Sequence, residues 1–433
     1  MIKQFPSHAD YDRSMSALNK LVKVPHLKSG VPAKNKEGKF YAIPGGFAKV
    51  YKINSQQKEY ALRCWLAEQS EIGERYKEIK NFLKNTTLPY FINFDYYEKG
   101  IAVTTNGSCE LYPVICMHWI KHPTLGKFIK NNLTNTTAME KISDAFLSMV
   151  KDLHNNKIAH GDLQVGNIIV IESGGNFSLK LIDYDSLYFP GMEKFSNLIG
   201  GVAGFQSPYR PIGYYNDRMD YFSELVIYLS LKVLARDPDN NSMLCAFPEE
   251  ILLFKEDDFK NPSNSFIFKY LSTETIAIKK LLEVMHDYCN VHNIDKLLPL
   301  EGILSQIANN SYQKLGINPN KPQIKTIPTV YPQKNVGKQK STVIKTPDAY
   351  VKTTPIGNTP VSQTNSIYPA NKPSGVKISQ VIKCHICNEI INNPSLIYCS
   401  NGHQISPMVK ICPKCKRKIP FLSNFCPKCG KMV

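Results

Sequence analysis

Apolar and polar positions alternate along the first part of the chain in the manner of half-buried β-strands. Five such runs can be read, at residues 40–43, 48–53, 59–65, 100–103 and 111–117. Strands are expected there because successive side chains of a strand point to opposite faces of a sheet. Between the third and fourth runs, apolar residues recur every three to four positions over 72–83, which predicts an amphipathic helix. The expected order is three strands, one helix and two strands.

The next part of the chain, from Leu125 to about Tyr312, has a mostly helical pattern. Two short apolar runs interrupt it at 168–171 and 179–182, and their spacing predicts a β-hairpin. Residues 1–30 are weakly patterned, so we expect an N-terminal lead-in that is flexible. A folded domain is therefore expected over residues 31–312.

The composition changes after this domain. Residues 313–380 combine recurring prolines with Thr, Ser, Asn and Lys, which predicts a disordered linker because so little apolar surface can be buried. Three threonines in it precede a proline, at positions 346, 354 and 359. They are either phosphoacceptor sites or ordinary linker composition, and the second interpretation is favoured.

Charge is concentrated in the tail. Residues 311–433 hold 18 basic and 2 acidic residues, and so carry +16 of the formal net charge of +17. A basic appendage on a near-neutral body indicates an anionic partner, such as nucleic acid, a membrane face or an acidic protein. A solvated linker kept soluble by lysine is an equally weighted alternative. Nucleic acid is the less favoured partner, because the tail has few aromatic side chains for stacking on bases.

Seven of the twelve cysteines lie in the last part of the chain, over residues 381–433. This use of cysteine favours a reducing compartment and a metal module over a disulfide scaffold. Two Cys-x-x-Cys pairs separated by ten residues predict a zinc ribbon with tetrahedral ligands Cys412, Cys415, Cys426 and Cys429. A second zinc site is predicted at Cys384, Cys387, Cys399 and His403. The alternative is a single ribbon with loose thiols, and His385 is a less favoured ligand.

No targeting or membrane segment is evident in the sequence. The first ten residues have no apolar core of the kind found in signal peptides. The longest apolar stretch, 225–234, is interrupted by polar residues and is too short to span a bilayer. We therefore expect a cytoplasmic protein with no transmembrane segment.

The residues with the clearest chemistry surround the predicted hairpin. His160-Gly161-Asp162 lies five residues before Asn167, and Asp183 follows the second apolar run. Phosphoryl transfer to a hydroxyl needs a carboxylate that orients the hydroxyl, and an amide oxygen with a second carboxylate that hold Mg²⁺ on the nucleotide phosphates. This segment resembles the catalytic loop and the metal-binding triplet of the protein-kinase superfamily.

The resemblance implies an α+β, bilobal protein-kinase-like fold whose small lobe ends near residue 117. In such a fold Asp162 would be the base or hydroxyl-orienting carboxylate, and Asn167 and Asp183 would bind Mg²⁺. Gln164 stands where Ser/Thr kinases carry a lysine that contacts the γ-phosphate. Gly161 replaces an arginine that reads a phosphate on the activation loop, so activity is not expected to depend on that phosphate.

The resemblance also assigns a nucleotide site, with departures from the family pattern. The loop that covers the phosphates would be formed by Gly45, Gly46, Phe47 and Val50, which match the glycine-rich pattern only in part. Arg63 stands where the family has a lysine, and the two side chains are not interchangeable at such a site.

Four further positions complete this site. Lys49 could supply a substitute ammonium. Glu78 is the expected helix partner of Arg63, with Glu71 and Glu74 as rivals. Met117 and Trp119 would form the gatekeeper and the hinge that meet adenine, although an edge strand running into a loop would have the same pattern.

Two downstream segments favour protein kinases over small-molecule kinases. Residues 204–210 stand where protein kinases carry their Ala-Pro-Glu region. Asp220 occupies the position of an aspartate that is buried beneath the catalytic loop. Over about residues 30–310 the chain thus resembles a divergent bacterial-type, eukaryotic-like Ser/Thr kinase.

Two functions follow from these patterns. The first is an ATP-dependent protein kinase that transfers the γ-phosphoryl group of Mg·ATP to Ser/Thr hydroxyls of a protein substrate, with a zinc-ribbon tail for target recognition. The second is a pseudokinase, used as a scaffold or nucleotide-gated switch that binds protein partners. Residues Arg63, Gln164 and Asp185 favour the second, whereas Asp162 with its two metal-binding partners favours the first.

Overall fold

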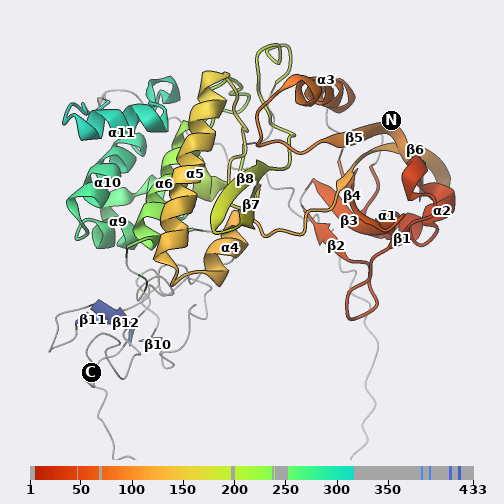
Figure 1. Cartoon of the computed structure of the whole chain (residues 1–433), viewed down its shortest axis with the longest axis horizontal. Helices are drawn as coiled ribbons and strands as arrows, with labels where there is room; N and C mark the ends of the chain where they lie inside the picture. Colours follow the sequence, from red (N-terminus) through yellow and green to blue (C-terminus); the bar gives the residue numbers. More distant parts are fainter. Residues whose placement is uncertain are drawn as a thin grey trace, which may run out of the picture.

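The computed structural model describes residues 5–45, 47–67, 71–196, 200–236, 238 and 252–315, together with four short strands nearer the C-terminus. Its main body is an α+β structure with a curled sheet at one end and a group of helices at the other (Figure 1). The α+β class expected from the sequence is confirmed at this level.

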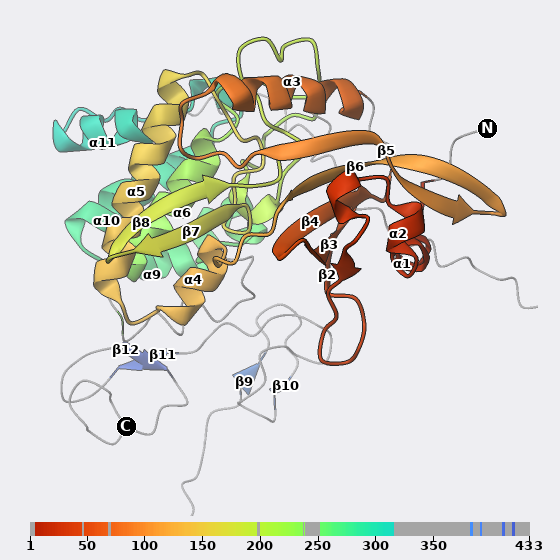
Figure 2. The same ribbon diagram turned by 45° about the vertical axis from the view of Figure 1, so that its right-hand side comes forward.

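The sheet contains six strands in the order β1-β3-β4-β6-β5, and β2 pairs with β3. Its strands are β1 (Val31–Pro32), β2 (Ala42–Pro44), β3 (Ala48–Ser55), β4 (Lys58–Trp65), β5 (Phe94–Thr105) and β6 (Ser108–His118). All these pairs are antiparallel. Helix α3 (Ile72–Asn85) lies between β4 and β5 in the chain, so the predicted order of strands and helix is confirmed. Figure 2 shows α3 running above the sheet toward the helices.

The N-terminal segment is folded, contrary to the expectation of a flexible lead-in. It forms α1 (His8–Met15), α2 (Leu18–Leu21) and the 3₁₀ helix η1 (Pro25–Leu27). Apolar side chains of this segment are buried against the sheet, namely Tyr11, Met15, Leu18, Val22, Val24 and Leu27. These residues recur at roughly helical spacing, and they cover the face of the sheet that looks away from the helices.

The second half of the body is built from helices around one short hairpin. The helices are α4 (Leu125–Asn131), α5 (Thr136–Asn155), α6 (Tyr221–Leu234), α8 (Glu256–Lys260), α9 (Phe266–Leu271), α10 (Ile276–Tyr288) and α11 (Leu300–Ala308). Three 3₁₀ helices accompany them, η2 (Ala203–Phe205), η3 (Pro262–Asn264) and η4 (Ile294–Lys296). Helix α6 is apolar almost throughout and is buried on nearly every side. It forms the centre of this helical half.

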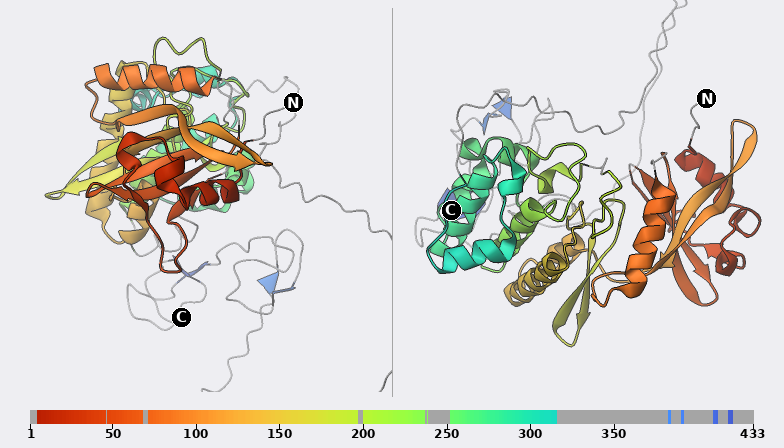
Figure 3. Two further views of the ribbon diagram at one scale, coloured as in Figure 1. Left: turned by 90° about the vertical axis from the view of Figure 1, so that its right-hand side faces the viewer. Right: turned by 90° about the horizontal axis from the view of Figure 1, so that it is seen from above.

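The predicted hairpin is present as β7 (Ile168–Ser173) and β8 (Asn176–Leu181). Figure 3 shows it on the side of the helices that faces the sheet. One apolar core continues across this region, because Phe82 of α3 stacks on Phe189 at a centroid distance of 4.3 Å and Phe94 of β5 lies 6.1 Å from the ring of Tyr184. The two halves are therefore held in contact by aromatic side chains.

Two short antiparallel pairs lie in the predicted zinc module. They are β9 (Ile382–Lys383) with β10 (Ile390–Ile391), and β11 (Val409–Ile411) with β12 (Lys418–Pro420). All the predicted zinc ligands and most of the predicted linker lie outside the described residues. None of the helices in the described ranges has the length and apolarity needed to cross a bilayer.

Candidate functional site

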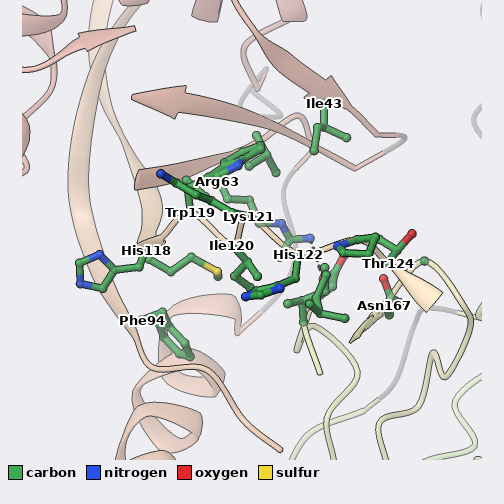
Figure 4. A pocket seen from close by; sticks show the side chains of 18 of the residues that line it. Ile43, Arg63, Phe94, His118, Trp119, Ile120, Lys121, His122, Thr124 and Asn167 are labelled. Atoms are coloured by element: carbon green, nitrogen blue, oxygen red, sulfur yellow. Dashed lines mark ion pairs between the residues drawn. The ribbon is translucent and has the colours of Figure 1, made fainter. Parts of the chain in front are cut away.

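A cavity of about 760 Å³ opens between the sheet and the loop that leads into β7 (Figure 4). One wall is a row of side chains across three strands, because Val50 pairs with Arg63 and Arg63 pairs with Ile115. Residues that pair directly across strands share one face of a sheet. The connection from Trp119 to Thr124 forms another side of the cavity, and the opposite side carries Asn167, Ile182 and Asp183. The apolar side chains of Val50 and Ile115 therefore share the lining with the polar side chains of Arg63, Asn167 and Asp183.

Asp162 and Asn167 are hydrogen-bonded to each other beside this cavity. The Asn167 amide nitrogen donates to the Asp162 backbone oxygen at 2.9 Å and to its carboxylate Oδ2 at 3.0 Å. These bonds use the amide N–H groups of Asn167 and leave its oxygen as the group that can face a cation. Asn167 lines the cavity, whereas Asp162 is not among the lining residues. The loop thus directs an amide oxygen inward and holds a carboxylate next to it.

The Asp162 carboxylate is enclosed by hydrogen-bond donors. Besides Asn167, its Oδ2 accepts from Gln164 Nε2 at 3.3 Å, and its Oδ1 accepts from the Val202 backbone N–H at 3.1 Å. Burial raises the pKa of Asp162, and the charge of His160 and these hydrogen bonds oppose the rise. Gln164 therefore contacts the predicted base and does not line the cavity.

Asp183 reaches the cavity from the end of the hairpin with an unsatisfied carboxylate. Its backbone lies in the left-handed region, with φ of +65°, which is uncommon for a residue other than glycine. Its Oδ1 lies 3.1 Å from Arg63 Nη2 but forms no hydrogen bond with the described residues, and 41% of the side chain is exposed. Burial raises the pKa of Asp183 to about 6, although the Arg63 charge opposes the shift.

Asp183 and Asn167 are the described residues that could hold a metal ion beside the cavity. A carboxylate without hydrogen-bond donors and an amide oxygen are hard oxygen ligands, which suit Mg²⁺. No group of three or more His, Cys, Asp or Glu side chains within the described part of the chain is arranged to bind a metal unaided. Two protein ligands fit an ion that is bound together with substrate phosphates.

The predicted burial of Asp220 beneath the loop is confirmed. Its carboxylate accepts the backbone N–H of His160 at 2.5 Å and that of Gly161 at 3.0 Å. Gly161 has a φ of +78°, and a Cβ there would lie 2.5 Å from the Ser186 backbone oxygen. Arg210, from the segment compared with Ala-Pro-Glu, donates to the Gly161 oxygen at 2.9 Å. The loop is thus fixed from both sides, and a larger residue than glycine would not fit.

Arg63 lies at the back of the cavity in a buried ionic contact with Asp185. Its two terminal nitrogens donate to the two Asp185 oxygens at 2.6 and 2.5 Å, a bidentate geometry that only a guanidinium can form. The Tyr76 hydroxyl joins this pair by accepting from Arg63 Nη1 at 2.9 Å and donating to Asp185 Oδ1. Burial would raise the pKa of Asp185, but the Arg63 charge and these hydrogen bonds hold it below its usual value.

The expected pairing of Arg63 with Glu78 is wrong. Glu78 binds Lys194 at 2.7 Å on the protein surface. Helix geometry explains the difference, since two residues along a helix rotate a side chain by about 200°. Tyr76 occupies the buried face of α3 beside Arg63, so Glu78 points away.

The suggestion that Lys49 substitutes for the missing lysine is also wrong. Its ammonium lies 2.5 Å from Asp12 of α1 and stands 5.0 Å from the ring centroid of Tyr51. Lys49 precedes Val50 in β3, and neighbouring strand residues point to opposite faces. Since Val50 faces the cavity, Lys49 faces the N-terminal helices.

The remaining predicted nucleotide residues divide into two groups. Met117 and Trp119 line the cavity as expected. The backbone N–H of Trp119 donates to the backbone oxygen of Glu59 at 2.8 Å. Gly45 and Phe47 are not among the lining residues, and Gly46 lies outside the described residues.

Sequence reasoning missed several residues that form the cavity. These include Tyr41, Ala61, Tyr76, Phe94, Thr124, Lys127 and Tyr184. Strand alternation could have identified Ala61, which lies two positions before Arg63 and therefore shares its face. Tyr76 could not be recognised as a polar partner, because a tyrosine in an apolar helical stripe reads as a core residue.

Comparisons with protein-family models and with curated proteins find no match to this chain.

Proposed function

We propose that this chain is an ATP-dependent protein kinase with a bilobal kinase-like fold, acting on Ser/Thr hydroxyls of a protein substrate. The observation that carries the proposal is the cavity, where Arg63, Asn167 and Asp183 meet beside apolar side chains of the sheet. A nucleotide needs these two environments together, an apolar slot for the base and a polar end for phosphates and their cation. A volume of about 760 Å³ is within the range of small-molecule sites.

The residues beside the cavity support a direct transfer to a hydroxyl. Mg·ATP, when bound, supplies the phosphoryl group and an ion that neutralises charge on the phosphates. Asn167 and Asp183 would hold that ion through oxygen atoms, and Arg63 would contact phosphate. The substrate hydroxyl oxygen forms a bond to the γ-phosphorus as the bond to the ADP oxygen breaks, and Asp162 orients the hydroxyl and accepts its proton.

The C-terminal tail would direct this activity to its target. We propose that residues 313–380 form the linker and residues 381–433 the zinc module, with Zn²⁺ held by the cysteine pairs described from the sequence. Such a short module has little core of its own, so metal binding would supply much of its folding free energy. The basic charge of the tail would favour an acidic face on the protein substrate.

A nucleotide-gated pseudokinase switch is the second candidate, and two contacts favour it. Both terminal nitrogens of Arg63 donate to Asp185, and the Asp162 Oδ1 accepts the Val202 N–H. A substrate hydroxyl must displace or share this last contact before Asp162 can act as a base. In the pseudokinase the same cavity would bind nucleotide without transfer.

The test is transfer of labelled γ-phosphate from Mg·ATP by the pure full-length chain, to itself and to a mixed peptide library. Asp162→Ala should lower the rate by about 10²- to 10⁴-fold, the range for loss of a general base. Asp257→Ala, an exposed aspartate in α8, is the matched control and should keep the full rate. Equal rates in wild type and Asp162→Ala would overturn the proposed kinase activity. Binding of Mg·ATP without any transfer would support the pseudokinase switch, and absence of Mg·ATP binding would overturn both proposals.

A further inference from the structure

Three side chains from three separate elements meet behind the cavity: Arg63 of β4, Tyr76 of α3 and Asp185 in the segment after β8. Arg63 and Asp185 form two hydrogen bonds, and Tyr76 bonds to both of them. The side chains of the charged pair are only 10% and 5% exposed. Such a contact is fixed before any ligand arrives, because burial and four shared hydrogen bonds restrict every rotamer.

Helix α3 contributes no carboxylate to this contact. Its acidic residue nearest to the expected position, Glu78, pairs with Lys194 at the surface. What α3 offers is the neutral hydroxyl of Tyr76. The negative charge that balances Arg63 comes instead from the same segment that carries Asp183, two residues earlier.

Arg63 keeps donors available in spite of this contact. A guanidinium has five N–H groups in a fixed plane. Three hydrogen bonds are formed with Tyr76 and Asp185. The two remaining N–H groups, on Nε and Nη2, form no hydrogen bond with the described residues, and Nη2 lies 3.1 Å from Asp183 Oδ1 as an ion pair. Arg63 also lines the cavity. A lysine at this position would be a point charge, and it could not bind Asp185 with one set of N–H groups while presenting another set in a fixed plane.

We propose that Asp185 is the positioning residue for Arg63, and that Arg63 thereby presents its remaining N–H groups to the phosphates of a bound nucleotide. The inference rests on the proposed function, since it assigns a role within that nucleotide site. Arg63, Asp185 and Asp183 then form a unit carried by β4 and the segment after β8. Helix α3 supports this unit through Tyr76 alone, so the phosphate contact does not require a carboxylate of α3.

The alternative is that the pair merely ties the sheet to the loop. A purely structural pair would lower the melting temperature when broken and would reduce the fraction of folded protein. It would not change the affinity of the folded molecules for nucleotide. The two roles are separated by comparing the change in KM for ATP with the change in kcat, and by measuring the binding of nucleotide directly.

The experiment measures calorimetric binding of Mg·ATP to the full chain, with thermal melting of each variant alongside. Asp185→Asn removes the charge but keeps the shape, and should weaken Mg·ATP binding by about tenfold or more, as expected for loss of a charge-assisted contact. Arg63→Lys should weaken it to a similar extent. Glu78→Gln should remain within about twofold of wild type.

Three outcomes would decide the matter. Folded Asp185→Asn that binds Mg·ATP as wild type does, or Glu78→Gln that weakens binding as strongly as Asp185→Asn, overturns the inference and leaves the proposed function standing. Wild-type protein that does not bind Mg·ATP overturns the proposed function itself. If Asp185→Asn does not fold, Asp185→Glu replaces it. The longer side chain keeps the carboxylate charge but displaces Arg63. This variant should raise the KM for ATP more than it lowers kcat.

Discussion

Two buried clusters of charge in this protein can be compared directly. The first joins Arg63 with Asp183 and Asp185 beside the cavity. The second lies among the helices, where His154 of α5 contacts Glu224 of α6 at 2.8 Å and Glu301 of α11 at 2.9 Å. Each has a basic side chain between two carboxylates, and each contains a buried carboxylate oxygen without a hydrogen bond to the described residues.

The difference between them is access. The carboxylate oxygens without a hydrogen bond are Asp183 Oδ1 and Glu224 Oε2. The Asp183 side chain is 41% exposed and lines the cavity, whereas that of Glu224 is 3% exposed and is not among the residues that line it. An unsatisfied buried oxygen is therefore a poor indicator of a functional site by itself. The indication comes from an unsatisfied oxygen on a side chain that a ligand can reach.

The largest expected effect comes from breaking the enclosed cluster. His154→Ala leaves Glu224 without its cation in the centre of the helices, and should lower the free energy of unfolding by about 3–5 kcal/mol, as for other buried pairs that lose one partner. Urea denaturation measures the change. Glu301→Gln should cost much less, because Glu301 is partly exposed and can be hydrated. A His154→Ala protein as stable as wild type would mean that this cluster contributes nothing.

The same cluster predicts a dependence of stability on pH. Burial alone would lower the pKa of His154, but the Glu224 charge and the hydrogen bonds that the imidazole donates to both carboxylates raise it to about 10. The Tyr221 ring and Glu301, near which Lys151 stands, complete the surroundings of the imidazole. Since the folded pKa exceeds the unfolded value of 6.5, the stabilisation is complete below that value and is lost as the pH rises toward about 10.

The measurement is the difference in urea midpoint between wild type and His154→Gln across this pH range. Taking the difference removes the titration of lysines and tyrosines elsewhere in the chain. The difference should be largest at about pH 6.5, where the stabilisation is complete, and should shrink as the pH rises toward about 10. A constant difference would show that His154 stays neutral in the folded protein.

Much of the sheet and of the site could be predicted from the sequence, because both depend on local patterns. Strand alternation located β3, β4 and β6 within a few residues, and the motif around Asp162 indicated which side chains lie near the cavity. What local patterns could not predict is which charges meet. Arg63 and Asp185 are 122 positions apart, and only the folded chain decides between Asp185 and the glutamates of α3.

The errors have physical causes that can be named. Lys49 was assigned by its place in a loop motif, although the alternation of its own strand excludes it from the face of Val50. The N-terminal helices were overlooked because α1 is short and polar on most of its surface. Their apolar stripe is recognisable only once the sheet that it covers is known.

A smaller effect is expected from Gly161→Ala, which tests how rigidly the loop that carries Asp162 is held beside the cavity. The left-handed backbone costs a residue with a Cβ about 1–2 kcal/mol. Contact of the new Cβ with the Ser186 oxygen at 2.5 Å adds to that cost. The variant should unfold at lower urea, and γ-phosphate transfer should fall further than the loss of folded protein explains, because the loop that carries Asp162 must shift. Gly174→Ala, also at positive φ but with open space around it, is the matched control.

The smallest effect is expected from Lys49→Met. Lys49 and Asp12 form a third charged pair, on the face of the sheet opposite the cavity. Removing the ammonium leaves Asp12, whose side chain is partly exposed and can be hydrated, so the stability should change by no more than about 1 kcal/mol. The affinity for Mg·ATP should not change, because β3 separates this pair from the cavity. Weaker binding in a folded Lys49→Met protein would mean that charge acts across the sheet, and that access to the cavity is not what distinguishes the functional cluster from the others.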